Sequence, residues 1–226
     1  MEGDIVSHRG RIPALIVLLA AVAFGVAACT GSTHLKPVPP ASAPGEPLPT
    51  TAATPSRPAI PEGPAEQIAI LSSDPGLAID AAVGPMPRDC RATIEPPLSG
   101  PNRGGVFQCM DFALPSTDSS SLTIIAGHSA PSFETVFNRL YPQGKKLVGR
   151  EVLLRTQTSG SHWLVYRIQS VDTPLKTELP YRADIWGDGS TSTAGRLILV
   201  TCLQNADRSP STHNFIAVAQ FVEVRS

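Results

Sequence analysis

Residues 197–202 have the sequence Leu-Ile-Leu-Val-Thr-Cys. A run of aliphatic and β-branched residues predicts a buried strand, which would hold the thiol of Cys202 at its C-terminal end. A second apolar run, residues 122–127, ends immediately before His128. Two strands that each end in a reactive side chain suggest a Cys–His nucleophile pair. A buried structural cysteine and an unrelated histidine explain these two stretches equally well.

Around these two runs, residues 67–226 have the pattern of a mostly β domain. Residues 132–140 are the exception, because their apolar side chains recur at helical spacing and Ser132 is a suitable N-cap. Seven or eight short strands with one or two short helices favour a closed β-barrel over a sandwich. The expected strands are residues 67–71, 77–83, 106–112, 122–127, 151–156, 162–171, 197–202 and 214–224.

The composition before this domain is different. Ten of the 37 residues from 30 to 66 are proline, and the apolar content there is too low to form a core. We therefore expect residues 30–66 to be a disordered, proline-rich stalk of polyproline type. The formal net charge of the chain is −1, which provides no basic surface for nucleic acid.

Residues 1–29 have the features of an export signal. Arg9 and Arg11 precede an apolar run, residues 12–28, which as a helix is slightly shorter than a membrane core. Residues 26–29, Val-Ala-Ala-Cys, resemble the bacterial lipobox, in which the cysteine is lipidated after cleavage. This resemblance makes Cys29 the lipidation site, whereas an uncleaved signal anchor is the alternative. Either arrangement leaves the remaining chain outside the cytoplasm.

The other cysteines divide into a pair and a single residue. Cys90 and Cys109 flank a segment rich in proline, glycine and arginine, and in an exported protein such a pair predicts a disulfide. With Cys29 assigned to the anchor, Cys202 is the remaining thiol. A free thiol in an oxidising compartment is most simply explained by catalysis.

Three motifs in this order resemble the sortase family, specifically its actinobacterial class E/F-like group. They are residues 124–129 (Ile-Ile-Ala-Gly-His-Ser), residues 136–140 (Val-Phe-Asn-Arg-Leu) and residues 197–202, which end in the sortase Leu-x-Thr-Cys signature. The resemblance implies an eight-stranded β-barrel at the extracytoplasmic face of the membrane. It also implies a cysteine transpeptidase that cleaves LPXTG-like signals of surface proteins between Thr and Gly and transfers the acyl group to an amine of a cell-wall precursor.

The resemblance also implies roles for individual residues. Cys202 would attack the threonine carbonyl, His128 would act as general acid and then general base, and Thr201 would lie next to the substrate. Sortases have in addition an arginine near the start of the final strand, which steadies the oxyanion. Here Thr212 or His213 occupies that place, so Arg208 is the candidate arginine and His213 the alternative donor.

The sequence also allows functions other than that of an active sortase. Because the arginine is displaced, the domain could instead be a non-catalytic sortase-like lipoprotein that binds the cell wall. An L,D-transpeptidase also uses a Cys–His pair, but its Ser-His-Gly-Cys signature is absent. Acidic residues at 172, 178, 184 and 188 lie where some sortases bind calcium, although a glycine-rich turn explains this spacing as well. We expect a monomer without a metal or cofactor.

Overall fold

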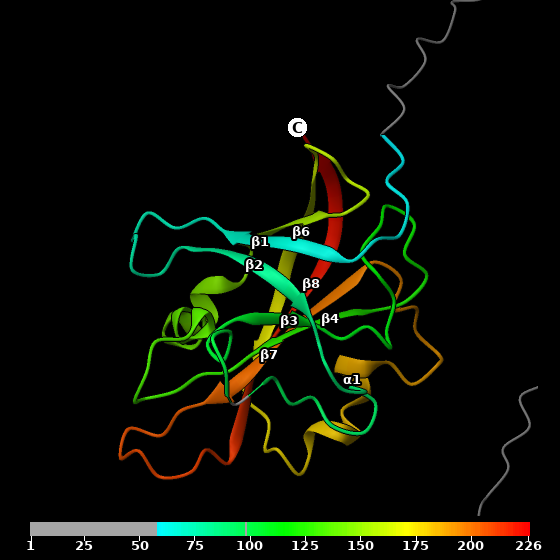
Figure 1. The fold of residues 1–226 in the computed structure, drawn as a ribbon. Coiled ribbons are helices and arrows are strands. Elements are labelled where there is room, and N and C mark those ends of the chain that lie inside the picture. The colour runs from blue at the N-terminus through cyan, green and yellow to red at the C-terminus, as the bar shows by residue number, and fades with distance from the viewer. Residues whose placement is uncertain (1–57, 98) are drawn as a thin grey trace, which may run out of the picture. The chain divides into compact units, whose positions relative to one another are not determined.

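A computed structural model describes residues 58–97 and 99–226, whose strands form one closed barrel (Figure 1). Around the barrel the strands follow the order β1-β2-β3-β4-β7-β8-β6-β5. Two neighbouring pairs, β2 with β3 and β4 with β7, are parallel, and the others are antiparallel. The predicted closed eight-stranded barrel is therefore confirmed.

Each predicted strand has a counterpart in the structure. The observed strands are β1 Ala65–Ile70, β2 Ile79–Pro85, β3 Val106–Gln108, β4 Thr123–Gly127, β5 Glu151–Thr156, β6 Trp163–Asp172, β7 Arg196–Leu203 and β8 His213–Arg225. The largest difference is β3, which we expected to continue to Phe112. It ends at Gln108, and the chain turns at Met110 and Asp111 directly after the disulfide-bonded Cys109. At the other end of the domain, packing begins before residue 67, since Ile60 is already buried.

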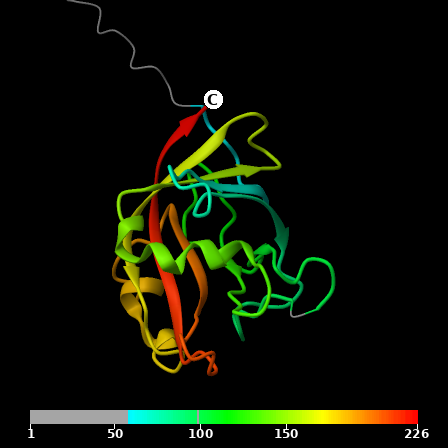
Figure 2. The same ribbon diagram turned by 90° about the vertical axis from the view of Figure 1, so that its left-hand side faces the viewer.

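The helical segments are short. They are the 3-10 helices η1 Val136–Arg139, η2 Tyr141–Leu147 and η3 Leu179–Tyr181, and the α-helix α1 Ala183–Trp186. Figure 2 shows the segment that contains η1 and η2 crossing the barrel strands. The helix predicted from residue 132 begins later, and Ser132 is not its N-cap. Thr135 caps η1 instead, by accepting a hydrogen bond from the backbone N–H of Asn138.

Residues before η1 are held by a side chain rather than by helical bonds. The amide of Asn138 accepts from the N–H of Ala130 and donates to its carbonyl, both at 2.9 Å. These two bonds fold residues 130–135 back as a loop, which explains the late start of the helix. They also fix the chain that directly follows His128.

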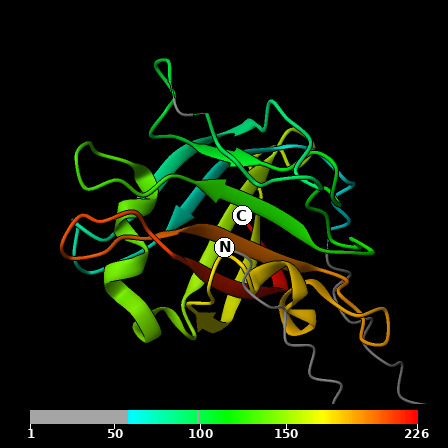
Figure 3. The same ribbon diagram turned by 90° about the horizontal axis from the view of Figure 1, so that it is seen from below.

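The strands near the end of the chain bury both of their faces. Leu197 and Leu199 point into the barrel, where they join a core to which every strand contributes. Ile198 and Val200 point to the outer face, where η3, α1 and the Cys90–Cys109 disulfide cover them. Figure 3 shows β4, β7 and β8 side by side, with α1 against them. The continuous apolar run of β7 thus reflects a strand with two buried faces.

No helix in residues 58–97 and 99–226 is long and apolar enough to cross a membrane. The export signal, Cys29 and most of the proline-rich stalk lie outside the described residues.

Candidate active site

The register of two parallel strands places the predicted histidine and cysteine together. Strands β4 and β7 pair in parallel, with Ala126 next to Val200. Two residues further along each chain are His128, which directly follows the end of β4, and Cys202 on β7. The Ser129 hydroxyl bonds to the Cys202 carbonyl, so the chain after β4 still lies beside β7 at this point.

Strand alternation also decides which face the two side chains occupy. Successive side chains point to opposite faces, so His128 follows Ala126 and Cys202 follows Val200 onto the outer face of the barrel. Both residues are half-buried, and Cys202 is the free cysteine among the described residues. A thiol and an imidazole therefore share one partly exposed face, beyond the apolar cover of η3 and α1.

One hydrogen bond orients the histidine ring. Nε2 of His128 lies 2.8 Å from the carbonyl oxygen of Pro96. A carbonyl can only accept, so Nε2 carries a hydrogen, and Nδ1 is the ring nitrogen that remains for proton exchange. The Pro96 carbonyl thus takes the place of the third group that orients the base in a nucleophile–base pair.

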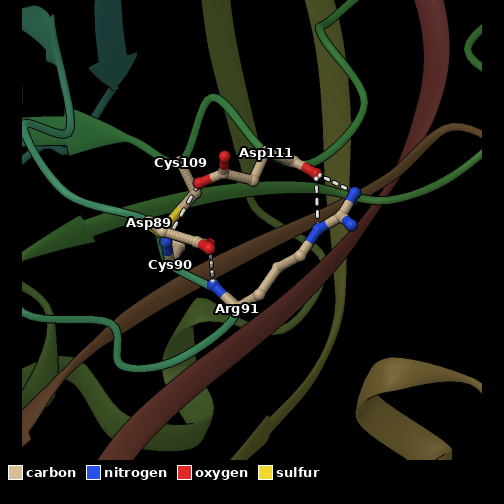
Figure 4. Close-up of a disulfide and its surroundings, with 5 residues drawn as sticks. All are labelled: Asp89, Cys90, Arg91, Cys109 and Asp111. Atoms are coloured by element: carbon tan, nitrogen blue, oxygen red, sulfur yellow. Dashed lines mark hydrogen bonds between the residues drawn. A yellow bond between two sulfur atoms is a disulfide. The ribbon is translucent and has the colours of Figure 1, made fainter.

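The Pro96 carbonyl is held by the segment that the disulfide closes. Cys90 and Cys109 are bonded, as the sequence predicts, with their Cα atoms 5.7 Å apart. Figure 4 shows how Asp111 reinforces this closure. Its carboxylate accepts from the N–H of Cys90 at 3.0 Å, and its carbonyl accepts from the Arg91 guanidinium at 2.9 Å. The disulfide therefore helps to hold the segment that contains Pro96, and the Pro96 carbonyl in turn orients the ring of His128.

A second set of hydrogen bonds joins the ends of β4 and β7. The Ser129 hydroxyl donates to the carbonyl of Cys202. The side-chain amide of Gln204 donates to the carbonyl of Ser129 at 2.8 Å and lies 2.9 Å from its hydroxyl. Ser129 directly follows His128, and Gln204 lies two residues beyond Cys202. We call Ser129 and Gln204 the strand-end clamp.

Replacing Gln204 with alanine is expected to loosen this clamp. We expect the free energy of unfolding to fall by about 1 kcal/mol, as for a typical hydrogen bond. The turnover number should fall about tenfold with little change in KM, because the two reactive groups lose their fixed separation. Denaturation and steady-state kinetics measure these effects.

Gln220 provides the matched control for that variant. Its side-chain amide donates to the Ala194 carbonyl at 2.7 Å, at the far end of β7. Gln220→Ala should therefore alter stability without altering turnover. Equal effects of the two substitutions on turnover would contradict a positioning role for Gln204.

The remaining predicted residues lie in different places. Thr201 is buried, and alternation turns its side chain into the barrel, away from the face of Cys202. Arg208 is exposed in the loop after β7, and its side chain makes no hydrogen bond or ion pair within the described part of the chain. His213 lies opposite Leu203, on the face opposite to that of Cys202, with Nδ1 2.9 Å from the Thr212 hydroxyl.

Three of the four acidic residues considered as calcium ligands, Asp172, Asp184 and Asp188, have structural partners. Arg182 bonds to both Asp172 and Asp184, at 2.5 and 2.6 Å, and its hydrogen bonds hold the pKa of Asp184 below the usual value. The hydroxyl and N–H of Ser190 similarly lower the pKa of Asp188. Within residues 58–97 and 99–226, no three His, Cys, Asp or Glu side chains gather as metal ligands would.

The sequence did not point to Pro96, Ser129, Gln204 or Asn214 as parts of this site. Asn214 is the residue paired with Cys202 across β7 and β8. A small amide at the start of the last strand carries a weak sequence signal. Only the register of the two strands, which depends on the loop between them, identifies its position.

Comparisons with known proteins agree with this architecture. No protein-family model matches the chain, and no curated protein matches it either. Among solved structures, the SrtA sortase from Actinomyces oris is similar at a TM-score of 0.50 and 13% identity, over 77% of this chain and 89% of that one. Sortase A from Corynebacterium diphtheriae has a TM-score of 0.46 and 20% identity, over 74% and 62% of the two chains.

Streptococcus agalactiae sortase C1, solved in complex with MTSET, has a TM-score of 0.46 and 14% identity. That match covers 72% of this chain and 70% of the other. At these identities the similarity concerns the fold. The barrel described above has the sortase fold.

Proposed function

We propose that this chain is an extracytoplasmic cysteine transpeptidase that acts on an LPXTG-like sorting signal. The observation that supports the proposal most directly is the parallel pairing of β4 with β7, since Cys202 lies on β7 and His128 directly follows β4. The sortase fold and the Leu-x-Thr-Cys signature supply the reaction class. Within the sortases, the three sequence motifs favour the actinobacterial class E/F-like group.

The reaction would proceed through a thioester. Nδ1 of His128 takes the proton of the Cys202 thiol, and the resulting thiolate attacks the carbonyl carbon of the signal's threonine to form a tetrahedral oxyanion. As the C–N bond to glycine breaks, His128 donates a proton to the leaving amine, and a thioacyl-enzyme remains. His128 then accepts a proton from the incoming amine as it attacks the thioester. The products are a new amide and the regenerated thiolate.

The disulfide supports the proposed location. Disulfides persist in oxidising compartments outside the cytoplasm, and Cys90–Cys109 holds the segment that orients His128. The clients would be surface proteins that carry the sorting signal, and the acceptor would be an amine of a cell-wall precursor. We further propose that the chain acts as a monomer.

The anchor is proposed from the sequence, since residues 1–29 lie outside the described structure. If Cys29 is lipidated, Cys29→Ala should leave the protein unprocessed or release it from membranes. Fractionation and immunoblotting measure this effect. Membrane retention at the processed size in the alanine variant would contradict a lipid anchor and favour an uncleaved signal segment.

The function is tested with a set of quenched peptides that contain LPXTG and related motifs. We expect the full-length protein to cleave at least one of them between Thr and Gly and, with an added amine, to form the transfer product. The control is Cys202→Ala, which should be inactive. If the wild-type protein is as inert as this variant toward the whole set, the transpeptidase proposal is wrong and the non-catalytic binding function replaces it.

A further inference from the structure

We propose that the side-chain amide of Asn214 donates a hydrogen bond to the oxyanion that forms when Cys202 attacks an acyl carbonyl. This inference rests on the proposed function, since it assigns a catalytic residue to the same site. The group that stabilises the oxyanion would then be a neutral amide on β8. Four observations support it.

The first observation is the pairing of the two residues. Cys202 on β7 lies directly opposite Asn214 on β8 in an antiparallel ladder. Directly opposed residues point to the same face of a sheet, so Asn214 shares the outer face with Cys202 and His128. Cys202 on β7 thus lies between Asn214 on β8 and His128, which directly follows β4.

The second observation is the type of pair. The N–H of Asn214 donates to the carbonyl of Pro174 at 3.0 Å, and the carbonyl of Cys202 accepts from the Ser129 hydroxyl. These backbone groups point away from each other, which identifies a non-hydrogen-bonded pair. In such pairs the Cα atoms are only about 4.5 Å apart and the side chains lie closest together. The amide of Asn214 is therefore held beside the thiol.

The third observation concerns the amide itself. Nδ2 of Asn214 donates to the carbonyl of Thr201 at 3.2 Å, and because a carbonyl only accepts, this bond fixes which end of the amide is the nitrogen. The nitrogen has two hydrogens, and the second bonds to no atom in the described part of the chain. Asn214 is also half-buried, as Cys202 is, so a substrate carbonyl could reach this hydrogen.

The fourth observation is that neither Arg208 nor His213, the other possible donors to the oxyanion, is held beside Cys202. Arg208 lies six residues beyond Cys202, in an exposed loop, with a left-handed backbone at φ 61° and no partner for its guanidinium in the described structure. His213 is adjacent to Asn214 in sequence, so alternation directs it to the other face of β8. A donor fixed before the reaction stabilises an oxyanion better than one that must first be ordered. Asn214 meets this condition and Arg208 does not.

The chemistry requires only a neutral donor. Attack by the thiolate moves negative charge onto the carbonyl oxygen, and an amide N–H at hydrogen-bond distance from that oxygen stabilises the transition state. Loss of one such donor typically lowers turnover by about 10²–10³-fold. The attack of the same thiolate on an alkyl halide forms no oxyanion and should not depend on Asn214.

This difference gives a test that needs no sorting signal. The full-length protein is treated with p-nitrophenyl acetate, whose acetyl group passes to the sulfur of Cys202 as p-nitrophenolate leaves. In parallel it is treated with iodoacetamide, which alkylates the same sulfur as iodide leaves. Peptide mass mapping follows both reactions at Cys202, and the ratio of the acylation rate to the alkylation rate is compared between variants.

We expect Asn214→Ala, and the similarly sized Asn214→Leu, to lower this ratio by about 10²-fold. Arg208→Ala should leave it within about twofold of the wild-type value, because an exposed arginine would not reach the oxyanion. A fall of less than about tenfold in both Asn214 variants, or an equal fall in Arg208→Ala, would overturn the proposal. So would a parallel loss of alkylation that leaves the ratio unchanged, since Asn214 would then act only by positioning the thiol.

Asn214→Arg keeps the test decisive if the other variants fold poorly. It restores a donor at the same position and should recover most of the acylation-to-alkylation ratio, whereas a ratio as low as in Asn214→Leu contradicts the proposal. The outcome is also separable from the proposed function. Failure to cleave any LPXTG-type peptide, together with normal acetylation of Cys202, removes the function and leaves the role of Asn214 to be judged by the ratio.

Discussion

Replacing His128 with glutamine is expected to lower peptide cleavage by about 10²–10⁴-fold, the range typical for loss of a general acid–base. Glutamine can still donate from Nε2 to the Pro96 carbonyl, which His128 contacts at 2.8 Å. It cannot pass a proton to the leaving amine or take one from the acceptor. The substitution therefore removes the proton transfer and retains the contact that holds the disulfide-closed segment. Single-turnover cleavage of the best peptide measures the effect.

His128→Ala is the matched comparison, because it removes both the proton transfer and the contact with Pro96. We expect it to be as inactive as the glutamine variant and also less stable, by about 1 kcal/mol for one lost hydrogen bond. A glutamine variant that retains more than about a tenth of wild-type activity would contradict a role in proton transfer. The histidine would then act only by orienting the surrounding chain.

Removal of the disulfide by Cys90→Ser together with Cys109→Ser should lower the free energy of unfolding by about 3 kcal/mol, because a closed loop of this length restricts the unfolded chain. The bond joins residues 19 positions apart. The melting temperature should fall by roughly 10 °C for a domain of this size. Turnover should fall as well, since the Pro96 carbonyl is no longer held against His128. Urea denaturation and peptide kinetics measure the two effects.

Arg91→Ala provides the control for that result. It leaves the disulfide intact and removes only the exposed hydrogen bonds between the guanidinium and the Asp111 carbonyl, at 2.9 and 3.3 Å. We expect a loss of less than about 1 kcal/mol and normal turnover. If the double serine variant is no less stable than Arg91→Ala, the disulfide does not hold the Pro96 segment against His128.

The predictions for His128 and for the disulfide depend on strands, which the sequence identifies well, and on contacts between distant residues, which it does not identify. The strands β4 and β7 could be predicted because continuous aliphatic runs have few alternatives when turn residues bound them. The positions of Cys202 and His128 at the strand ends followed directly. The barrel followed from the number and shortness of the strands, and its closure is confirmed. Local pattern was sufficient for each of these inferences.

The partners of the reactive side chains required the three-dimensional structure. The contact between His128 and Pro96 joins residues 32 positions apart, and Pro96 itself lies between β2 and β3, outside any helix or strand. The pairing of Cys202 with Asn214 depends on how many residues the intervening loop takes up before β8 begins. A shift of one residue would have put His213 opposite the thiol instead. Periodicity gives strands, but it does not give their register.

The late start of η1 has a similar cause. The apolar spacing in residues 132–140 is helical, and Phe137 and Leu140 are indeed buried. The side chain of Asn138 nevertheless bonds to the backbone of Ala130, which competes with helix formation in the preceding residues. Helix propensities describe single residues, so they do not include a hydrogen bond between the Asn138 side chain and the Ala130 backbone. The sequence therefore predicted the buried face correctly and the N-cap incorrectly.

The central claim is that Cys202 carries the acyl group of a sorting signal during the reaction. Its most direct test is peptide mass mapping of the full-length protein, quenched in acid during turnover of the best LPXTG-type peptide. We predict that the Cys202 peptide gains the mass of the substrate up to and including its threonine, and that hydroxylamine removes this mass. Cleavage of the peptide without acylation of Cys202, or acylation of another residue, would contradict this claim.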